Sequence, residues 1–207
     1  MPKWFSIEWT RPGEFPGILP DSFYGRDAVS VARDLVGCRL LSFCGCGVTG
    51  GTIAETEAYC GVLDRGCHAF NYRRTERTEP MYGPPGTAYV YMIYGLHHCL
   101  NVVCLREGRP HAVLIRVVIP EVGAGLMAAR RGSGATGEDG RGLSDGPGKL
   151  CQALGIDRSL NGASFVCGPV ILFEGNRGNA PLLARPRVGL GDVGEFSRIP
   201  WRFTLEG

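Results

Sequence analysis

The chain has 207 residues, of which 44% are hydrophobic and 20% charged, as in an ordinary globular protein. This length suits one domain whose core needs no disulfide bonds. The formal net charge is only +2, so overall charge does not single out a nucleic-acid-binding protein, although 20 of the 22 basic residues are Arg. No segment is apolar over the length of a membrane span, and the N-terminal sequence MPKWFSIEWTRPGEF lacks the apolar run of a signal peptide. We therefore expect a soluble, intracellular protein.

The first elements along the chain are predicted to be one helix and one hairpin. The first 23 residues are rich in Pro, Gly and aromatic side chains and are expected to be irregular. A helix is predicted between an N-cap at Asp27 and a stop at Gly37, because apolar residues recur there at helical spacing. Strands are predicted over 38–43 and 52–60, and the glycine-rich stretch between them is expected to form a turn.

The rest of the chain is predicted to alternate short strands and helices. Residues 61–87 are expected to be mostly loop, and 132–146 a flexible polar loop. The predicted helices cover 123–131 and 147–154. The predicted strands cover 89–93, 100–105, 112–119, 165–173 and 198–205. This order predicts a single α+β domain with a largely antiparallel sheet.

The segment IAETEAYCG places two carboxylates and a phenol on one side of a predicted strand. Side chains alternate along a strand, so Glu55, Glu57 and Tyr59 share one face. If that face is buried, the two like charges disfavour joint ionisation, which suits general-base chemistry. A strand at the solvent-facing edge of a sheet explains the same residues equally well.

Several cysteines and one histidine raise the question of a metal site. Cys44, Cys46, Cys60, Cys67 and His68 lie within one region, but the chain contains no C-x2-C pair and Cys44-x-Cys46 is tighter than the usual zinc spacing. The sequence therefore predicts no metal site. His68 alone could serve as a base, as a stacking surface or as a structural residue.

The segment DGPGKLCQ resembles a phosphate-binding loop only in part. Leu143 and Leu150 stand where that loop requires Gly and then Ser or Thr. A helix N-terminus behind Gly-Pro-Gly could still bind one phosphate, with Lys149 beside it. A simple helix start is the favoured interpretation of this segment alone.

Three tyrosines in AYVYMIYG differ in phase. Tyr89 and Tyr91 share one strand face, whereas Tyr94 precedes Gly95 at a predicted turn. A side chain at a hairpin tip can wedge between base pairs, and Tyr91 could stack on an unstacked base. Strand aromatics often only pack the core, and the spacing does not decide between these interpretations.

In chain order, these segments resemble the alkyladenine (3-methyladenine) DNA glycosylase family. The resemblance rests on IAETEAYCG, His68, RRTERTEPMYGPPGTAYVYMIYGLHHCLNVV, LIRVVIP, DGPGKLCQALGI and RVGLGDVGEFSRIPWRF. It runs from about Phe23 to Phe203, so we expect an N-terminal arm over 1–22 and a methylpurine-DNA glycosylase-like domain over 23–207. It implies a compact domain with a curved, mostly antiparallel sheet, surrounding short helices and a protruding, DNA-inserting β-hairpin.

The resemblance also implies an activity. The family flips damaged purines out of duplex DNA and hydrolyses the N-glycosidic bond without a cofactor, which starts base excision repair. The implied lesions are 3-methyladenine, 7-methylguanine, hypoxanthine and ethenoadenine. The implied partner is double-stranded DNA holding a damaged purine, and we expect a monomer in the cytoplasm or nucleoid of a prokaryote, or in a eukaryotic nucleus.

Residue roles follow from the matched motifs. Glu57 matches the general base, and Arg116 matches an arginine that helps to position the water. The positions of the base pocket are Tyr59, His68, Tyr91 and Asn101. The pocket asparagine would clash with the exocyclic amine of guanine. Tyr94 matches the residue that intercalates into the duplex. The DNA-facing positions are Arg73, Thr75, Met81, Leu96 and, beside a phosphate, Lys149.

Some positions depart from the family pattern, and alternatives stay open. Thr78 stands where the family often has Asn, and Gly66 and Cys67 replace small residues before His68. These changes leave the loop geometry and the lesion range open. Because Lys3 and Lys149 are the only lysines, we expect a monofunctional enzyme rather than one that attacks the sugar with an amine. The alternatives are a catalytically weak lesion-binding protein of the same fold and a hydrolase of free nucleosides.

Overall fold

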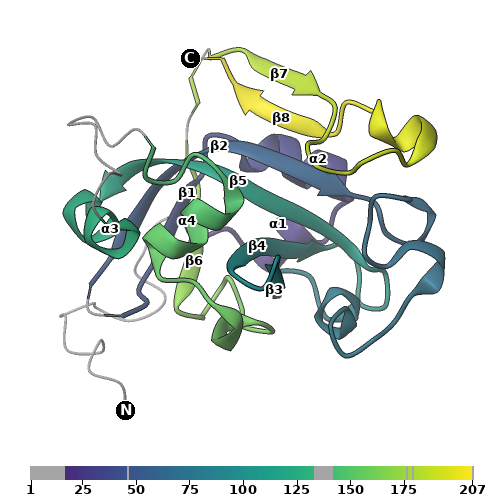
Figure 1. The fold of residues 1–207 in the computed structure, drawn as a ribbon, viewed down its shortest axis with the longest axis horizontal. Helices are drawn as coiled ribbons and strands as arrows, with labels where there is room; N and C mark the ends of the chain where they lie inside the picture. The colour runs from purple at the N-terminus through teal and green to yellow at the C-terminus, as the bar shows by residue number, and fades with distance from the viewer. Residues whose placement is uncertain (1–16, 46, 133–141, 176, 179, 207) are drawn as a thin grey trace.

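The computed structural model describes residues 17–45, 47–132, 142–175, 177–178 and 180–206 (Figure 1). The helices are α1 (Asp21–Tyr24), α2 (Ala28–Leu35), α3 (Ala124–Arg131) and α4 (Pro147–Leu154). The strands are β1 (Arg39–Ser42), β2 (Thr49–Tyr59), β3 (Ala88–Ile93), β4 (His97–Cys104), β5 (His111–Val122), β6 (Val170–Phe173), β7 (Leu182–Arg185) and β8 (Arg202–Leu205). Short 3-10 turns are η2 (Gly61–Leu63), η3 (Phe70–Tyr72), η4 (Glu79–Tyr82), η5 (Arg158–Leu160) and η6 (Gly194–Ser197). The predicted α+β class is confirmed.

Within the described residues, eight strands form one antiparallel sheet. Its main path runs β3-β4-β5-β2-β1-β6, and β8 joins β2 and carries β7. The start of β2 pairs with β1, whereas Glu55–Glu57 pair with β8 on one side and with β5 on the other. The IAETEAY segment therefore lies inside the sheet, and its interpretation as a solvent-facing edge strand is wrong.

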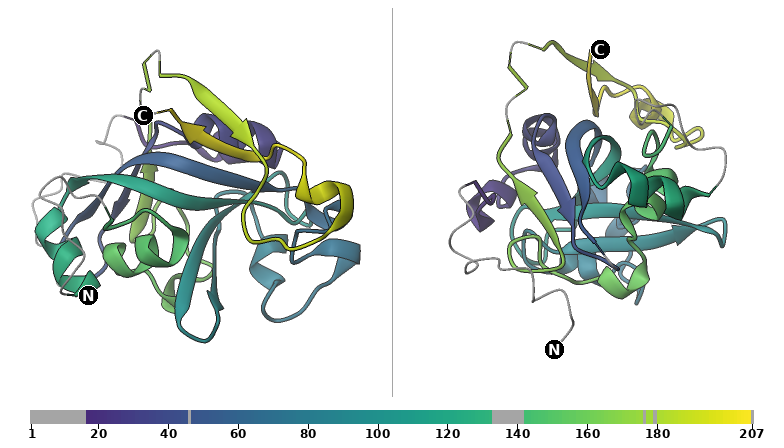
Figure 2. Two further views of the ribbon diagram at one scale, coloured as in Figure 1. Left: turned by 45° about the horizontal axis from the view of Figure 1, so that its top comes forward. Right: turned by 90° about the vertical axis from the view of Figure 1, so that its left-hand side faces the viewer.

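Helices cover both faces of the sheet. α2 packs against β2 and β5 on one face, and α4 packs against β4 and β5 on the other (Figure 2). The predicted N-cap of α2 is confirmed, because the Asp27 side chain accepts hydrogen bonds from the N–H groups of Val29 and Ser30. Val31 and Leu35 then lie fully buried on the inner face of this helix.

The last part of the glycine-rich stretch expected to be a turn, Thr49–Gly51, already belongs to β2. A Cβ atom at Gly50 would lie 2.0 Å from the carbonyl oxygen of Leu40, and one at Gly51 would lie 1.9 Å from that of Ile119. Only glycine lets the neighbouring strands approach so closely. These glycines therefore serve strand packing, which local turn chemistry does not reveal.

Other boundaries also differ from expectation. The late strands are shorter than predicted, because β6 begins after Pro169 and β8 after Pro200, and β7 was not predicted. Part of the segment expected to be irregular forms α1, and Leu19 before it is buried. The expectations for residues 1–16, and for most of 132–146, fall outside the described residues.

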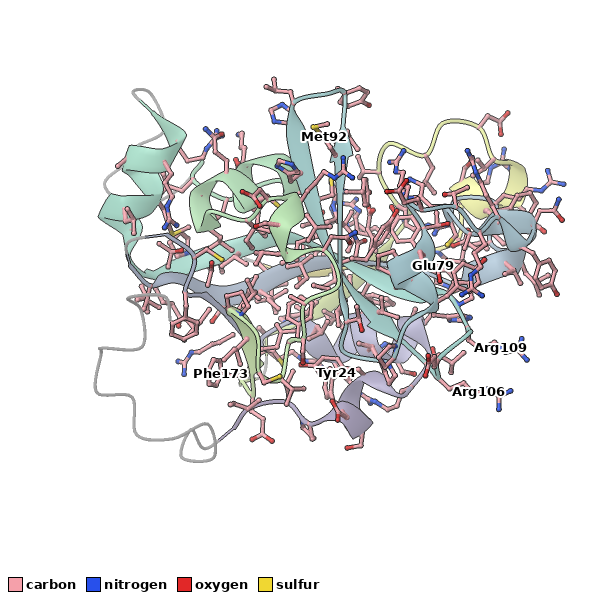
Figure 3. All side chains as sticks on the ribbon, turned by 90° about the horizontal axis from the view of Figure 1, so that it is seen from below. Tyr24, Glu79, Met92, Arg106, Arg109 and Phe173 are labelled. Carbon is pink, nitrogen blue, oxygen red and sulfur yellow. The ribbon has the colours of Figure 1, made fainter. Side chains whose placement is uncertain are left out.

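The β3–β4 hairpin projects from the domain. Both views in Figure 2 show it extending past the neighbouring elements, and Figure 3 shows Met92 on the part that stands clear. β3 is the terminal strand of the sheet path, so the hairpin joins the rest of the sheet through the pairing of β4 with β5. No helix in the described part of the chain has the length and apolar character needed to cross a membrane.

Candidate active site

Irregular pairing between β2 and β5 brings two carboxylates and an arginine together. The register passes from Glu55↔Val117 to Thr56↔Ile115, which leaves Arg116 without a partner residue opposite it. Such a bulge bends the strand and redirects a side chain. The Nε atom of Arg116 lies 2.5 Å from Glu55 Oε1, and its Nη1 atom lies 3.3 Å from Glu57 Oε1. The two carboxylates therefore share a cation instead of facing each other as bare like charges.

The Glu57 carboxylate is completely buried and heavily hydrogen-bonded. The hydroxyl of Tyr59 donates to Oε2 at 2.9 Å, and the N–H of Val188 donates to Oε1 at 2.7 Å. Arg116 contacts the same Oε1 atom. A carboxylate offers about four acceptor positions, so these three donors leave one for another group.

Burial and charge fix the protonation of the groups around Glu57. Burial first, and then the charge of Glu57, raise the pKa of Tyr59 well above its ordinary value, so its hydroxyl stays a donor. Burial lowers the pKa of Arg116, but the carboxylates of Glu57 and Glu55 outweigh it and leave that pKa raised. Arg116 therefore stays cationic beside the buried carboxylate.

The four residues predicted for the base pocket do lie together beside this carboxylate. The cavity that they line also contacts Cys67, Met81, Tyr89 and Ala112, and its volume of about 10 Å³ suits a single water molecule. The rings of His68 and Tyr91 meet edge to face with centroids 4.6 Å apart, and Asn101 donates to the carbonyl oxygen of Tyr89. The structure therefore shows the pocket in a closed arrangement.

His68 is held neutral by its surroundings. Its Nδ1 atom lies 2.9 Å from the hydroxyl of Tyr89. Burial first, and then the charges of Arg77 and Arg73, lower the pKa of His68 to about 4. Tyr89 is fully buried, and its hydrogen bond to His68 was not foreseen.

The low pKa of His68 predicts a loss of stability in mild acid. An unfolded chain protonates this ring near pH 6.5, whereas the folded chain does so only near pH 4, so stability falls as the pH drops between these values. We expect His68→Gln to remove at most about 2 kcal/mol of the stability that the wild-type protein loses between pH 7 and pH 5. Urea unfolding at pH 7 and pH 5 measures it, with exposed His97→Gln as the matched control. An equal acid loss in wild type and His68→Gln would contradict the assignment.

The hairpin tip holds Tyr94 in an unusual backbone conformation. Tyr94 has φ 52° and Gly95 has φ 68°, and the N–H of Leu96 donates to the carbonyl oxygen of Ile93. Two positive φ values in succession characterise a type I′ turn, which favours Asn and Gly. The tyrosine is 93% exposed, so core packing does not explain its presence there.

The positions expected to face DNA are placed in different ways. Arg73 and Thr75 are exposed on the loop after η3, and Leu96 is exposed on the hairpin. Met81 differs from this expectation, because the η4 turn buries it and makes it line the cavity. The Lys149 ammonium lies 2.8 Å from Asp145 Oδ1, so this cation already has a partner.

Sequence reasoning missed three residues near the site. The guanidinium of Arg77 lies 5.2 Å from the centroid of the Tyr91 ring. Arg187 and Asp64 form a buried ion pair behind Tyr59. The RVGLG segment contains Arg187, but nothing local indicates that this arginine is buried.

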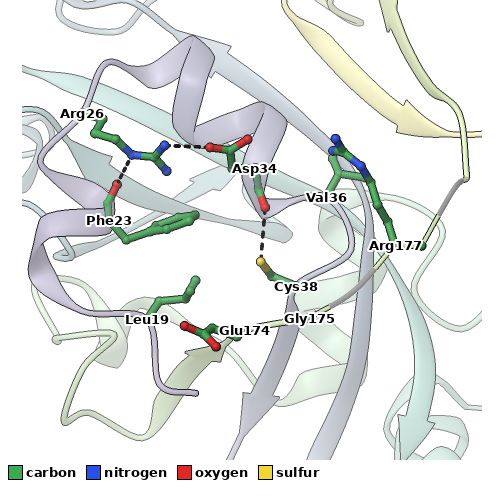
Figure 4. A pocket seen from close by; sticks show the side chains of 10 residues that line it. Leu19, Phe23, Arg26, Asp34, Val36, Cys38, Glu174, Gly175 and Arg177 are labelled. Carbon is green, nitrogen blue, oxygen red and sulfur yellow. Dashed lines mark hydrogen bonds and ion pairs between the residues drawn. The ribbon is translucent and has the colours of Figure 1, made fainter. Parts of the chain in front are cut away.

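A larger cavity lies elsewhere and contains none of the predicted site residues. It has a volume of about 570 Å³ and is lined by residues of α1, α2 and the segment after β6, including Phe23, Asp34, Glu174 and Arg177 (Figure 4). Arg26 at this cavity pairs with Asp34 at 2.7 Å. Across the described ranges, no group of three or more His, Cys, Asp or Glu side chains is arranged to hold a metal ion.

Comparisons with known proteins place this chain among the DNA glycosylases, hydrolases that act on N-glycosyl bonds in DNA repair. The family model described as Methylpurine-DNA glycosylase (MPG) matches residues 22–207. The chain belongs to this family, which confirms the resemblance drawn from its motifs.

Curated relatives from several organisms agree with this family. A protein of Desulfitobacterium hafniense (strain Y51) is 42% identical over 192 residues, which cover 91% of this chain and 95% of the relative. One from Rhodopseudomonas palustris (strain BisB18) is 43% identical over 189 residues, covering 91% and 88%. One from Methanocella arvoryzae is 41% identical over 186 residues, covering 90% and 91%. All three are named as inferred 3-methyladenine DNA glycosylases.

Proposed function

We propose that the protein is a monofunctional glycosylase that flips alkylated or deaminated purines from duplex DNA and hydrolyses their N-glycosidic bonds. The substrate class comprises 3-methyladenine, 7-methylguanine, hypoxanthine and ethenoadenine. One observation carries this proposal: the buried Glu57 carboxylate keeps an acceptor position beside a pocket walled by aromatic rings. A water molecule at that position would give its proton to Glu57 and attack the sugar.

The chemistry requires a negative charge close to the reacting sugar. Cleavage of a glycosidic bond passes through an oxocarbenium-like state, which a nearby carboxylate stabilises. Glu57 supplies that carboxylate, and the cationic Arg116 beside it would help to orient the water. An alkylated purine is already cationic and leaves readily, so one carboxylate suffices for such lesions.

The pocket is suited to a damaged base that is electron-poor. Aromatic faces attract cations, and a neutral His68 adds no repelling charge. A base stacked between two rings needs them about 7 Å apart, twice a normal contact distance. The His68 and Tyr91 rings are closer, at 4.6 Å, so entry of the base requires them to separate.

The hairpin favours duplex DNA over the free nucleoside as substrate. Tyr94 is exposed at its tip, where it would fill the space left by a flipped base. A free nucleoside offers no such space. A lesion-binding protein without turnover remains the alternative, and the contact between Glu57 and Arg116 favours the enzyme.

A single-turnover assay tests the proposed function. We expect strand breaks after heat and alkali in a duplex holding one hypoxanthine, ethenoadenine or 3-methyladenine, because these treatments cleave the abasic product. An undamaged duplex is the control. The absence of cleavage above this control for every damaged purine would overturn the proposal. A covalent enzyme–DNA adduct trapped by borohydride would overturn the monofunctional assignment alone.

A further inference from the structure

A buried ion pair behind the pocket has no part in the chemistry described so far. Asp64 follows η2, and Arg187 lies between β7 and β8. Their side chains are both 0% exposed and meet in two parallel hydrogen bonds, of 2.6 Å to Oδ2 and 2.7 Å to Oδ1. Burying two charges is costly even when they pair, so such a pair is weak evidence for stability alone. The residues that the Asp64–Arg187 pair contacts therefore indicate its role.

The Arg187 guanidinium supports Tyr59 directly. It lies 4.8 Å from the centroid of the Tyr59 ring and 5.0 Å from that of Trp201. Its Nη1 atom also donates to the carbonyl oxygen of Ala58, the residue before Tyr59 on β2. Both the ring and the adjoining backbone are therefore held by one planar cation.

The residue after Arg187 completes a link to Glu57. The N–H of Val188 donates to Glu57 Oε1, while the Tyr59 hydroxyl donates to Oε2 of the same carboxylate. Two adjacent residues are thus linked to both carboxylate oxygens, Val188 directly to Oε1 and Arg187 through Tyr59 to Oε2, while Arg116 also contacts Oε1.

Asp64 supplies the anchor for Arg187. Its carboxylate also accepts hydrogen bonds from the N–H groups of Cys60 and Gly66, which fixes the turn that leads to His68. A Cβ atom at Gly66 would lie 2.9 Å from Nη2 of Arg187, so the turn packs closely on the guanidinium. The pair therefore joins the pocket loop to the C-terminal segment.

We propose that Arg187, anchored by Asp64, is a positioning residue that holds the Tyr59 hydroxyl on Glu57 and thereby orients the carboxylate for hydrolysis. This inference rests on the proposed function. Lysine keeps the charge but lacks the planar fork that pairs with Asp64 and stacks on the rings. Arg187→Lys should therefore leave DNA binding intact and slow the chemical step.

A double-mutant cycle with Tyr59→Phe tests this link. We expect Arg187→Lys to lower the single-turnover excision rate about tenfold in the wild-type background, since small misplacements are costly in catalysis. On the Tyr59→Phe background, which lacks the hydroxyl, the same change should cost about threefold or less. Arg185→Lys, on the exposed side of the same segment, is the matched control and should leave the rate unchanged. Equal losses on both backgrounds, or no loss, would overturn the proposal.

Two spectroscopic measurements distinguish a loss of positioning of Tyr59 from a loss of folding and from a lack of glycosylase activity. Near-UV circular dichroism verifies that Arg187→Lys is folded, and Asp64→Asn replaces it in the cycle if it is not. The NMR signal of the Tyr59 ring should shift in Arg187→Lys and stay in place in Arg185→Lys. If the wild-type protein excises no damaged purine, the proposed function fails, while this signal still decides whether Arg187 positions Tyr59. An unchanged Tyr59 signal would refute the link.

Discussion

Glu57→Gln is expected to lower the rate of base excision by about three orders of magnitude, within the range for loss of a general acid–base group. Glutamine keeps the size of the side chain and one acceptor oxygen, but it cannot take a proton from water. The buried contacts with Tyr59 and Val188 would also meet an amide that has only one oxygen. Single-turnover excision of hypoxanthine measures the rate, and fluorescence anisotropy should show unchanged affinity for the damaged duplex.

Glu55→Gln is the matched control for this result. Glu55 shares Arg116 with Glu57 and also contacts Arg202, but it forms no hydrogen bond with Tyr59. Replacing Glu55 should slow excision far less, because Glu55 is linked to Glu57 only through Arg116. Full activity in Glu57→Gln would show that the base is another group. Equal losses in both variants would point to overall charge at the site, not to proton transfer.

Tyr94→Ala is expected to lower excision from duplex DNA about tenfold to a hundredfold, since flipping a base costs a few kcal/mol. The side chain that would fill the vacated space is then missing, and the base returns to the stack more readily. Thermal stability should not fall, because the ring is 93% exposed and contributes little burial. Excision from a single-stranded oligonucleotide should stay unchanged, since no stack has to be filled there.

Tyr72→Ala is the matched control for Tyr94→Ala, because it removes the same kind of side chain from another exposed position. Tyr72 is 71% exposed and also has a positive φ, but it lies on the η3 turn and not on the hairpin. Tyr72→Ala should therefore leave duplex excision unchanged. If both variants lose activity equally, or if Tyr94→Ala slows excision from single strands as much as from duplex, Tyr94 has no specific role at the flipped site.

Local sequence signals predicted the features that depend on neighbouring residues. The capping side chain of Asp27 identified the start of α2. The two-residue period of a strand placed Tyr89 on a strand face and Tyr94 at the turn, and the structure buries the first and exposes the second. The wedge and stacking roles themselves remain predictions. The family resemblance, rather than spacing, selected Glu57 from the two glutamates of ETEAY.

Features that depend on distant parts of the chain could not be predicted. The buried Glu57 carboxylate accepts a hydrogen bond from the N–H of Val188, which lies 131 positions away in the sequence. The contact of Arg187 with Asp64 spans 123 positions, and no local pattern marks an arginine as buried. The closed contact of His68 with Tyr91 likewise arises from a loop packing against a strand.

The places of β2 and β3 in the sheet give the strand that carries Glu57 and the hairpin that carries Tyr94 different local stabilities. β2 has partner strands on both sides, so its backbone can exchange hydrogens with solvent only when much of the domain opens. β3 ends the sheet path, and although its residues Ala88–Val90 lie in the core, the exposed tip of the hairpin around Tyr94 can fray without disturbing it. The residue proposed to react thus stands on a rigid strand, while the tyrosine proposed to enter DNA stands where the fold tolerates motion.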